Sequence, residues 1–316
     1  MKTTTNIEEF KKHLEKQQYE LTGQHSACKI CSWTKKSLKD QGVCYKQKFY
    51  GIKSHLCCQI SPALNFCQNE CIYCWRDHKN FKIDNIDQPE DIIKNSILAQ
   101  RKLLSGFGGN EKVNKTKLKQ AQNPKNFAIS LTGEVLAYPK INELIKTLHQ
   151  QNCSTFIVTN GQFPKKIEKI EPPTQLYVSV SAPTKQLFNK ICKPLTSASW
   201  ENLINSLKAL KPLKQKTRTC IRLTLIKDLN MIHPEKYAEL INLAEPHFVE
   251  AKSYMWVGSS RERLEQKNMP RHEEVKEFAQ ELCKHSDYKI IDEQKESRVL
   301  LLMKKDFKGR IMKFQD

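Results

Sequence analysis

Short apolar runs alternate with longer amphipathic stretches along the chain from about residue 83 onward. The runs are rich in β-branched and aromatic residues, as expected of strands that are buried on both faces. They lie at 127–131, 154–159, 175–180, 219–226 and 247–254. Segments with helical periodicity lie between them, for example at 139–151, 199–210 and 234–244. The alternation predicts an α/β fold in which helices cover a parallel sheet.

Five or six strand–helix units of this kind are typical of a full or partial β/α barrel, whose functional side chains stand at the carboxyl ends of the strands. Two further apolar runs, at 288–292 and 297–304, predict an antiparallel pair that closes the sheet. The first 25 residues are polar and have the spacing of a short amphipathic helix.

One stretch interrupts the alternation. Residues 105–126 are rich in glycine, asparagine and lysine and contain few apolar residues, which predicts a long loop. Its lysines are candidates for contact with nucleic acid, and a solvated insertion without function is the alternative. They are Lys112, Lys115, Lys117, Lys119 and Lys125.

The chain is strongly basic, with 53 lysines and arginines against 34 acidic residues and a net charge of +19. Such a surplus favours polyanionic partners, although a generically basic surface is the alternative. No apolar run is long enough to cross a bilayer, and the N-terminus has no apolar core of a secretory signal. We therefore expect a cytoplasmic protein that does not contact the membrane.

Cysteine is unusually frequent for such a protein, with 12 residues of which eight lie between positions 28 and 74. Disulfides are rare in a reducing compartment, so metal binding is the better explanation of this concentration. Because residues 26–66 have little periodicity, we expect metal ligation to replace a hydrophobic core there. The dispersed cysteines have the surroundings of small core residues. They are Cys153, Cys192, Cys220 and Cys283.

Cys67, Cys71 and Cys74 form a C-x3-C-x2-C run. Three thiolates can hold three irons of a 4Fe–4S cluster, which leaves the fourth iron open. That iron can bind the amino and carboxylate groups of S-adenosylmethionine (SAM). The run, with Tyr73 before its last cysteine, resembles the signature of the radical SAM superfamily. Zinc, with His78 as a fourth ligand, is the alternative.

Polar motifs follow three of the predicted strands. Thr132-Gly133-Glu134 resembles the Gly-Gly-Glu-like motif with which radical SAM enzymes hold the amino group of SAM. Asn160 and Ser179 end the next two strands, where side chains would meet the same cofactor. Each motif alone is a turn signal, but three in succession after the cysteine run reinforce one another.

Cys31, Cys44 and Cys57 are evenly spaced upstream, with twelve residues between successive members. This spacing suits a second cluster with three protein ligands. Cys28 and Cys31 also form a C-x2-C pair, so a zinc knuckle on Cys28, Cys31, Cys44 and Cys57 is an equal alternative.

These cysteine runs, with the segments SLTGEVLAYP, VTNGQFP and AKSYMWVGSSRERLEQKNMPRHEEV, resemble the tRNA wybutosine-synthesising enzymes, the 4-demethylwyosine synthases. The resemblance extends from about residue 28 to the C-terminus and is to the short, archaeal-type form without a flavodoxin domain. It implies a partial (β/α)6 TIM-like radical SAM barrel with C-terminal antiparallel strands over residues 61–316. Residues 1–60 would form an N-terminal helix and a cysteine-rich extension.

The resemblance also implies an activity. The enzyme would condense N1-methylguanosine, beside the anticodon of tRNA-Phe, with two carbons of pyruvate to form the tricyclic base. Cys67, Cys71 and Cys74 would bind the SAM cluster, and Cys31, Cys44 and Cys57 an auxiliary 4Fe–4S cluster. SAM would be surrounded by Thr132, Gly133, Glu134, Asn160 and Ser179. An external flavodoxin- or ferredoxin-type donor would supply electrons. Because the sequence has no signal for an oligomer, we expect a monomer.

Lys46, two residues after Cys44, matches a lysine that the family links to pyruvate. It would either form a Schiff base or act beside pyruvate chelated by the auxiliary cluster, and a surface lysine is the alternative. Ser181 departs from the pattern, because the resemblance implies aspartate there. A radical SAM methylthiotransferase and a zinc-containing, non-enzymatic RNA-binding protein remain alternatives for the whole chain.

Overall fold

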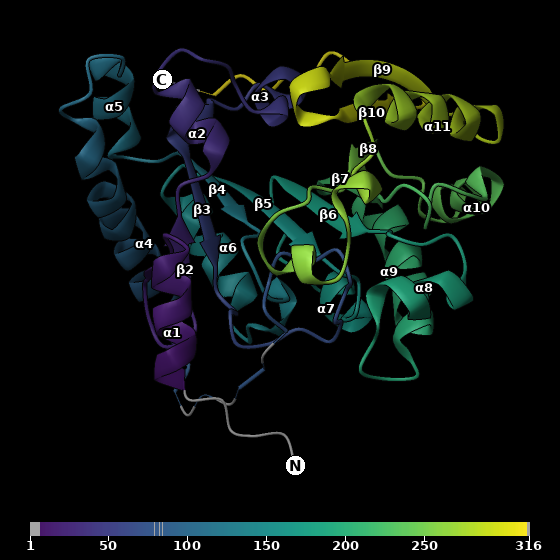
Figure 1. The fold of residues 1–316 in the computed structure, drawn as a ribbon, viewed down its shortest axis with the longest axis horizontal. Coiled ribbons are helices and arrows are strands. Elements are labelled where there is room, and N and C mark those ends of the chain that lie inside the picture. Colours follow the sequence, from purple (N-terminus) through teal and green to yellow (C-terminus); the bar gives the residue numbers. More distant parts are fainter. Residues whose placement is uncertain (1–6, 79, 82, 84, 315–316) are drawn as a thin grey trace. The chain divides into compact units, whose positions relative to one another are not determined.

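The structure is a computed structural model that describes residues 7–78, 80–81, 83 and 85–314. The chain divides into two compact units (Figure 1). The first comprises Met1–Cys67, Lys79–Ile157 and Met312–Asp316, and the second comprises Gln68–His78 and Val158–Ile311.

The first unit contains a mixed sheet in which the three later strands are parallel. β3 pairs with β4 and β4 with β5, so that Ile129 lies between Ile60 and Ile157. Both antiparallel pairs, β1 with β2 and β2 with β3, lie on one side of these strands. In order across the sheet, the strands are β1 (Glu20–Leu21), β2 (Ala27–Lys29), β3 (Cys57–Ser61), β4 (Asn126–Ile129) and β5 (Ser154–Thr159).

Helices cover this sheet. α4 packs against α6 and against β2 and β3, and it begins with Pro89 followed by two acidic residues, as the start of a helix favours. The α-helices are α1 (Ile7–Lys16), α2 (Ser32–Ser37), α3 (Tyr45–Tyr50), α4 (Pro89–Leu104), α5 (Lys115–Ala121) and α6 (Ile141–Gln150). The 3-10 turns are η1 (Ser54–Leu56), η2 (Ser105–Phe107) and η3 (Val135–Ala137).

Two expectations for this unit are wrong. Residues 105–126 are not a continuous loop, because they contain η2 and α5, and the Asn114 side chain caps α5 by accepting from Lys117 N at 3.1 Å. The cysteine-rich segment also takes part in a hydrophobic core, in which its Ile30 and Leu38 pack with Leu104 of α4 and Ala121 of α5. Apolar burial and metal ligation are therefore not exclusive in this segment.

The second unit contains three more parallel strands, β6, β7 and β8, with an antiparallel pair at one side. β10 pairs antiparallel with β8, Leu300 facing Ala251, and with β9, Leu300 facing Glu293. The antiparallel pair predicted at the end of the sequence is confirmed. In order, the strands are β6 (Gln175–Ser179), β7 (Arg218–Leu225), β8 (Phe248–Ser253), β10 (Val299–Met303) and β9 (Lys289–Gln294).

α9 packs against α7 and α10, and α11 packs against α10 and the strands β8, β9 and β10 (Figure 1). The α-helices are α7 (Pro164–Glu168), α8 (Lys185–Cys192), α9 (Ser199–Leu213), α10 (Pro234–Ala244) and α11 (His272–Lys284). The 3-10 turns are η4 (Gly258–Glu262), η5 (Gln266–Asn268) and η6 (Lys295–Ser297).

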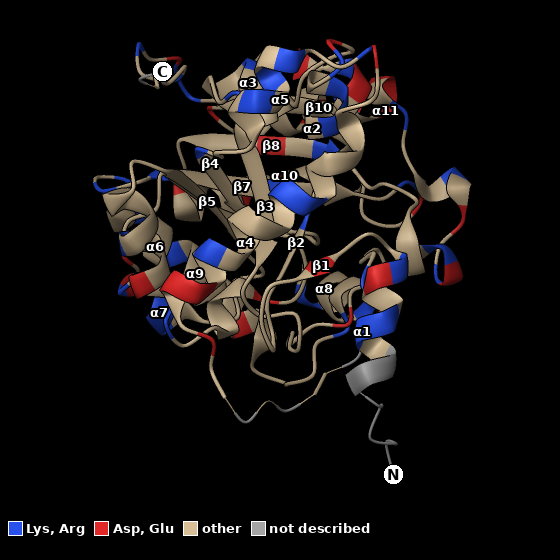
Figure 2. Cartoon of the chain, turned by 90° about the vertical axis from the view of Figure 1, so that its left-hand side faces the viewer, with Lys and Arg blue, Asp and Glu red and all other residues tan. Residues whose placement is uncertain are grey.

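The α/β class is confirmed, since buried parallel strands alternate with helices in both units. Three parallel strands in each unit agree with the six of the expected partial barrel. The domain boundary expected between residues 60 and 61 falls at the end of β3 and stays a prediction. Among the described residues, no helix is long and apolar enough to span a membrane. Lysines and arginines are spread over both units rather than gathered in one segment (Figure 2).

Leu301, in the middle of β10, is 0% exposed. Truncating it leaves a cavity, so Leu301→Ala should lower the free energy of unfolding by about 2–5 kcal/mol. Leu195→Ala is the matched control, since Leu195 is 45% exposed and its loss should change stability by less than about 0.5 kcal/mol. Urea unfolding measures both, and equal midpoints for the two variants would contradict this packing.

Candidate functional site

The segment that carries Cys71 and Cys74 has no helix or strand of its own. Its backbone is held by the last turn of α8 and by the residue that follows this helix. Glu70 N donates to Lys193 O at 3.1 Å, and Ile72 N donates to Ile191 O at 2.9 Å. These bonds satisfy polar groups that a loop would otherwise leave to water.

Arg263, which follows η4, fastens the same segment through its guanidinium group. Nε donates to Ile72 O at 3.2 Å, and Nη2 donates to the carbonyl oxygens of Cys74 and Arg76. One planar group thereby binds three carbonyls of the loop, which a lysine could not do. Sequence reasoning gave this arginine no role.

Gly258, at the start of η4, packs directly on the loop. Its φ is +58°, and a Cβ there would stand 2.6 Å from Trp75 O, so only glycine fits without movement. The next residue, Ser259, donates its N–H to the same oxygen at 3.0 Å. The segment between β8 and α11 therefore positions the cysteine loop.

Tyr73 connects the loop to the end of β6. Its hydroxyl oxygen lies 2.7 Å from Ser181 Oγ, and it also hydrogen-bonds the Cys71 thiol. Ser181 is buried, and its carbonyl oxygen accepts from Asn230 Nδ2 at 2.8 Å. The serine that departs from the family pattern is thus part of a hydrogen-bonded chain. A hydrogen bond with Cys192 raises the pKa of the Cys71 thiol, and burial raises it further.

In the first unit, the turn after β4 is fixed against residues 61–66, which lead into Cys67. Gly133 has a φ of +71°, and a Cβ there would overlap the carbonyl oxygen of Ala63. Glu134 N donates to Phe66 O at 2.8 Å, and Ser61 Oγ donates to the Thr132 carbonyl. The Thr-Gly-Glu motif and the approach to Cys67 are therefore neighbours.

Two side chains of this turn are buried. Glu134 accepts from Leu136 N at 3.1 Å through its carboxylate. Thr132 Oγ1 is buried and has no hydrogen-bond partner among the residues that the structure describes. An orphaned hydroxyl of this kind fits a site that a polar ligand completes.

Asn160 and Ser179 stand at the carboxyl ends of β5 and β6, as the sequence predicts. Asn160 Oδ1 accepts from Gln162 N at 3.0 Å, which closes a tight turn with Gly161 at a φ of +76°. Ser179 is the last residue of β6 and pairs with Arg222. Both side chains are half-buried.

The predicted auxiliary ligands come together within the first unit. Cys31 precedes α2 and accepts from Thr34 N at 3.4 Å, Cys44 precedes α3, and Cys57 begins β3. All three are half-buried. Burial and then the Cys31 thiol raise the pKa of Cys57, while the Lys46 ammonium lowers it. These thiols and Lys46 therefore lie within electrostatic range of one another.

Lys46, on α3, is only 8% exposed. Its Nζ lies 4.9 Å from the centre of the Phe156 ring, a contact that fixes the amine over the ring face. Lysines are rarely buried without a reason. The alternative of an ordinary surface lysine is wrong.

Cys28 and Cys58, the other two cysteines of this segment, are fully buried, and their sulfur atoms are 3.7 Å apart. Among the described residues, no group of three or more His, Cys, Asp or Glu side chains is arranged around one metal ion. A zinc knuckle on these cysteines and an auxiliary cluster on Cys31, Cys44 and Cys57 both stay predictions.

The predicted SAM-site residues belong to both units. Cys67, Thr132, Gly133 and Glu134 are in the first unit, and Cys71, Cys74, Asn160 and Ser179 are in the second. Their assembly into one site stays a prediction.

The chain matches the family described as Radical SAM superfamily over residues 61–241 and that described as Wyosine base formation over residues 243–304. It is 48% identical to the S-adenosyl-L-methionine-dependent tRNA 4-demethylwyosine synthase of Pyrococcus horikoshii, covering 92% of this chain and 87% of that protein.

Two solved structures are similar to it. One is described as TYW1 with a lysine-pyruvate adduct bound, with a TM-score of 0.87 and 40% identity, covering 94% of this chain and 96% of that one. The other, a crystal structure of archaeal TYW1, has a TM-score of 0.79 and 36% identity, covering 95% and 97%.

Replacing Arg263 by alanine removes the donors to three loop carbonyls. Arg263→Ala protein should lose most of the iron bound by the C-x3-C-x2-C loop, about four atoms per chain, as measured by iron analysis after anaerobic reconstitution. Arg261→Ala is the control, because Arg261 is exposed and stacks on Trp256 at 4.8 Å. Equal iron contents in the two variants would show that Arg263 does not position the loop.

Proposed function

Because the chain belongs to the radical SAM tRNA 4-demethylwyosine synthases, we propose that it converts N1-methylguanosine, beside the anticodon of tRNA-Phe, into the tricyclic base of 4-demethylwyosine with two carbons of pyruvate. The observation that carries the proposal is the buried Lys46 beside Cys31, Cys44 and Cys57. A relative of the same fold is described with a lysine-pyruvate adduct bound.

Membership of the superfamily implies SAM and a 4Fe–4S cluster. We assign Cys67, Cys71 and Cys74 as the ligands of that cluster. When bound, it supplies the electron that cleaves SAM and so the means of removing a hydrogen atom from the substrate methyl group. Arg263 and Tyr73 would hold the ligand loop still while this occurs.

The side chains proposed to surround SAM are Thr132, Gly133, Glu134, Asn160 and Ser179. Support comes from the buried, unpartnered Thr132 hydroxyl and from the Gly133 turn, which can lie against the Ala63 carbonyl only because glycine has no side chain. Within its own unit, each residue stands at the carboxyl end of a parallel strand, where this class of fold binds its ligands.

A second 4Fe–4S cluster on Cys31, Cys44 and Cys57 is part of the proposal. Burial raises the pKa of the Cys57 thiol, and the neighbouring Cys31 and Cys44 thiols raise it further. Bound iron would act in the opposite direction, because coordination to a metal favours the deprotonated thiolate over the thiol. The donor set therefore fits a cluster with one iron left open.

Lys46 is proposed as the group that binds pyruvate. Its amine would add to the keto carbon and lose water, which gives an imine and leaves the methyl and carboxylate groups in place. The Phe156 ring would keep the amine in one position, and burial on α3 would exclude competing water. Chelation of pyruvate by the open iron is the second arrangement.

The relatives' names set aside the methylthiotransferase and the non-enzymatic zinc protein. Use of tRNA-Phe, an external flavodoxin- or ferredoxin-type electron donor, a monomeric state and a cytoplasmic location stay predictions.

The test incubates reconstituted protein with SAM, a reductant, pyruvate and tRNA carrying N1-methylguanosine, followed by nucleoside analysis. Wild-type protein should form the tricyclic base. Lys46→Ala should abolish it while leaving the iron content unchanged, because Lys46 binds pyruvate and not iron. Lys48→Ala, on the exposed side of the same helix, is the matched control.

Formation of 5′-deoxyadenosine without a tricyclic base in the wild type would refute the substrate assignment. Turnover by Lys46→Ala at the rate of Lys48→Ala would refute the role of Lys46.

The auxiliary cluster has a separate test. Wild-type protein should bind about eight irons, and Cys31→Ala about four, because a single cube is lost. Cleavage of SAM without tRNA should continue in the variant. Cys283→Ala, in α11, is the control and should keep the full iron content. Equal iron in both variants would exclude a cluster on Cys31.

A further inference from the structure

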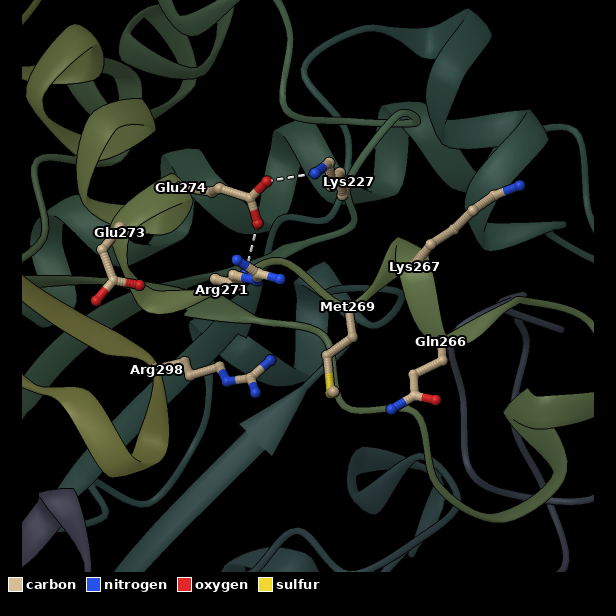
Figure 3. Close-up of a pocket in the computed structure, with 8 residues that line it drawn as sticks. All are labelled: Lys227, Gln266, Lys267, Met269, Arg271, Glu273, Glu274 and Arg298. Carbon is tan, nitrogen blue, oxygen red and sulfur yellow. Dashed lines mark hydrogen bonds and ion pairs between the residues drawn. The ribbon is translucent and has the colours of Figure 1, made fainter.

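The second unit contains a pocket of about 820 Å³ that the proposed chemistry does not use. Its walls come from the residues after β7, from η5 and from the starts of α11 and β10. Four basic and two acidic side chains line it, and Figure 3 shows the guanidinium groups of Arg271 and Arg298 near one another beside Met269. The lining residues are Lys227, Gln266, Lys267, Met269, Arg271, Glu273, Glu274 and Arg298.

The pocket stands at the carboxyl ends of the parallel strands of its unit. Lys227 is two residues beyond the end of β7, and the last residue of β8, Ser253, donates its N–H to Arg298 O at 2.9 Å. Asn230, in the loop after β7, donates to Ser181 O at 2.8 Å. The pocket and Ser181 therefore share the functional edge of this unit.

The acidic residues of the pocket are already engaged. Glu274 pairs with Lys227 and also accepts from Arg271 N at 2.6 Å, while Glu273 pairs with Lys295 at 3.1 Å (Figure 3). Neither the Arg271 nor the Arg298 guanidinium has a carboxylate partner among the residues that the structure describes. The Arg271 charge helps to lower the pKa of the Glu274 carboxyl, but the four basic side chains of the pocket still outnumber the two acidic ones, and a bound anion would balance this surplus.

Arg298 occupies a conformation that the turn itself does not favour. Its φ is +47°, in the left-handed region where glycine or asparagine is usual. One Nη1 hydrogen bond to Pro270 O, at 3.0 Å, orients the side chain, and the other N–H groups of the guanidinium have no partner in the part of the chain that the structure describes. Because the backbone conformation does not favour arginine here, we attribute its presence to a ligand of the guanidinium group. The planar guanidinium can donate two parallel hydrogen bonds to phosphate oxygens.

We propose that this pocket binds a backbone phosphate of the tRNA substrate, with Arg298 and Arg271 as the contacting groups. The proposal rests on the proposed function. A polyanion fits better than a small carboxylate, because Lys267, Gln266 and Arg271 are exposed at the rim. A single carboxylate would also leave most of the pocket volume empty.

The test uses Arg298→Asn, which removes the guanidinium but keeps a residue that tolerates the left-handed turn, and Arg271→Gln. Binding of tRNA carrying N1-methylguanosine is measured at several salt concentrations. Each variant should bind on the order of tenfold more weakly, and its slope of log affinity against log salt should fall by about 1. Lys208→Gln, an exposed position on α9, removes one charge elsewhere and is the control.

The variants should keep the wild-type melting temperature, the rate of 5′-deoxyadenosine formation without tRNA, and the KM for SAM and for pyruvate. Unchanged tRNA affinity and salt slope would overturn the proposal. A higher KM for SAM or pyruvate with unchanged tRNA affinity would overturn it too, by assigning the pocket to a small anion. Wild-type protein that binds tRNA through these arginines but forms no tricyclic base would refute the proposed function alone.

Discussion

A loop that carries metal ligands has no regular structure, yet its backbone polar groups still need partners. The second unit meets this need in two ways. The end of α8 pairs with Glu70 and Ile72, and the Arg263 guanidinium binds the carbonyls of Ile72, Cys74 and Arg76. The segment that follows β8 therefore has a task besides closing the fold, which is to hold the backbone that carries Cys71 and Cys74. Preorganised ligands of this kind spare the cluster the cost of ordering its own loop.

Much of the fold could be predicted because buried parallel strands are short and continuously apolar. β5 and α10 were predicted to the residue. β3 was not, because its cysteines look like metal ligands rather than strand residues. α5 was not, because its lysines conceal the face on which Ala121 is buried and Leu118 is half-buried. Propensity within a window cannot reveal a helix whose one buried face packs on a distant segment.

For the candidate site too, some residues could be predicted from the sequence and others could not. Local spacing was enough to identify the cysteine triads and the Thr-Gly-Glu turn. Arg263 and Gly258 were missed because their partners lie nearly two hundred residues earlier in the chain, at Ile72 and Trp75. Ser181 was read as a defect of a motif, and only its contact with Tyr73 gives it a place. Interactions between distant segments leave no periodic signal, so they emerge only in three dimensions.

We propose that a buried lysine beside a three-cysteine group delivers two carbons of pyruvate to a methylated guanosine. In the most direct measurement, the reconstituted enzyme receives uniformly carbon-13-labelled pyruvate with SAM, a reductant and tRNA carrying N1-methylguanosine. The mass of the modified nucleoside is then determined by mass spectrometry. A tricyclic nucleoside with two labelled carbons is expected. A tricyclic nucleoside without label, or one that forms equally well when pyruvate is withheld, would contradict this proposal.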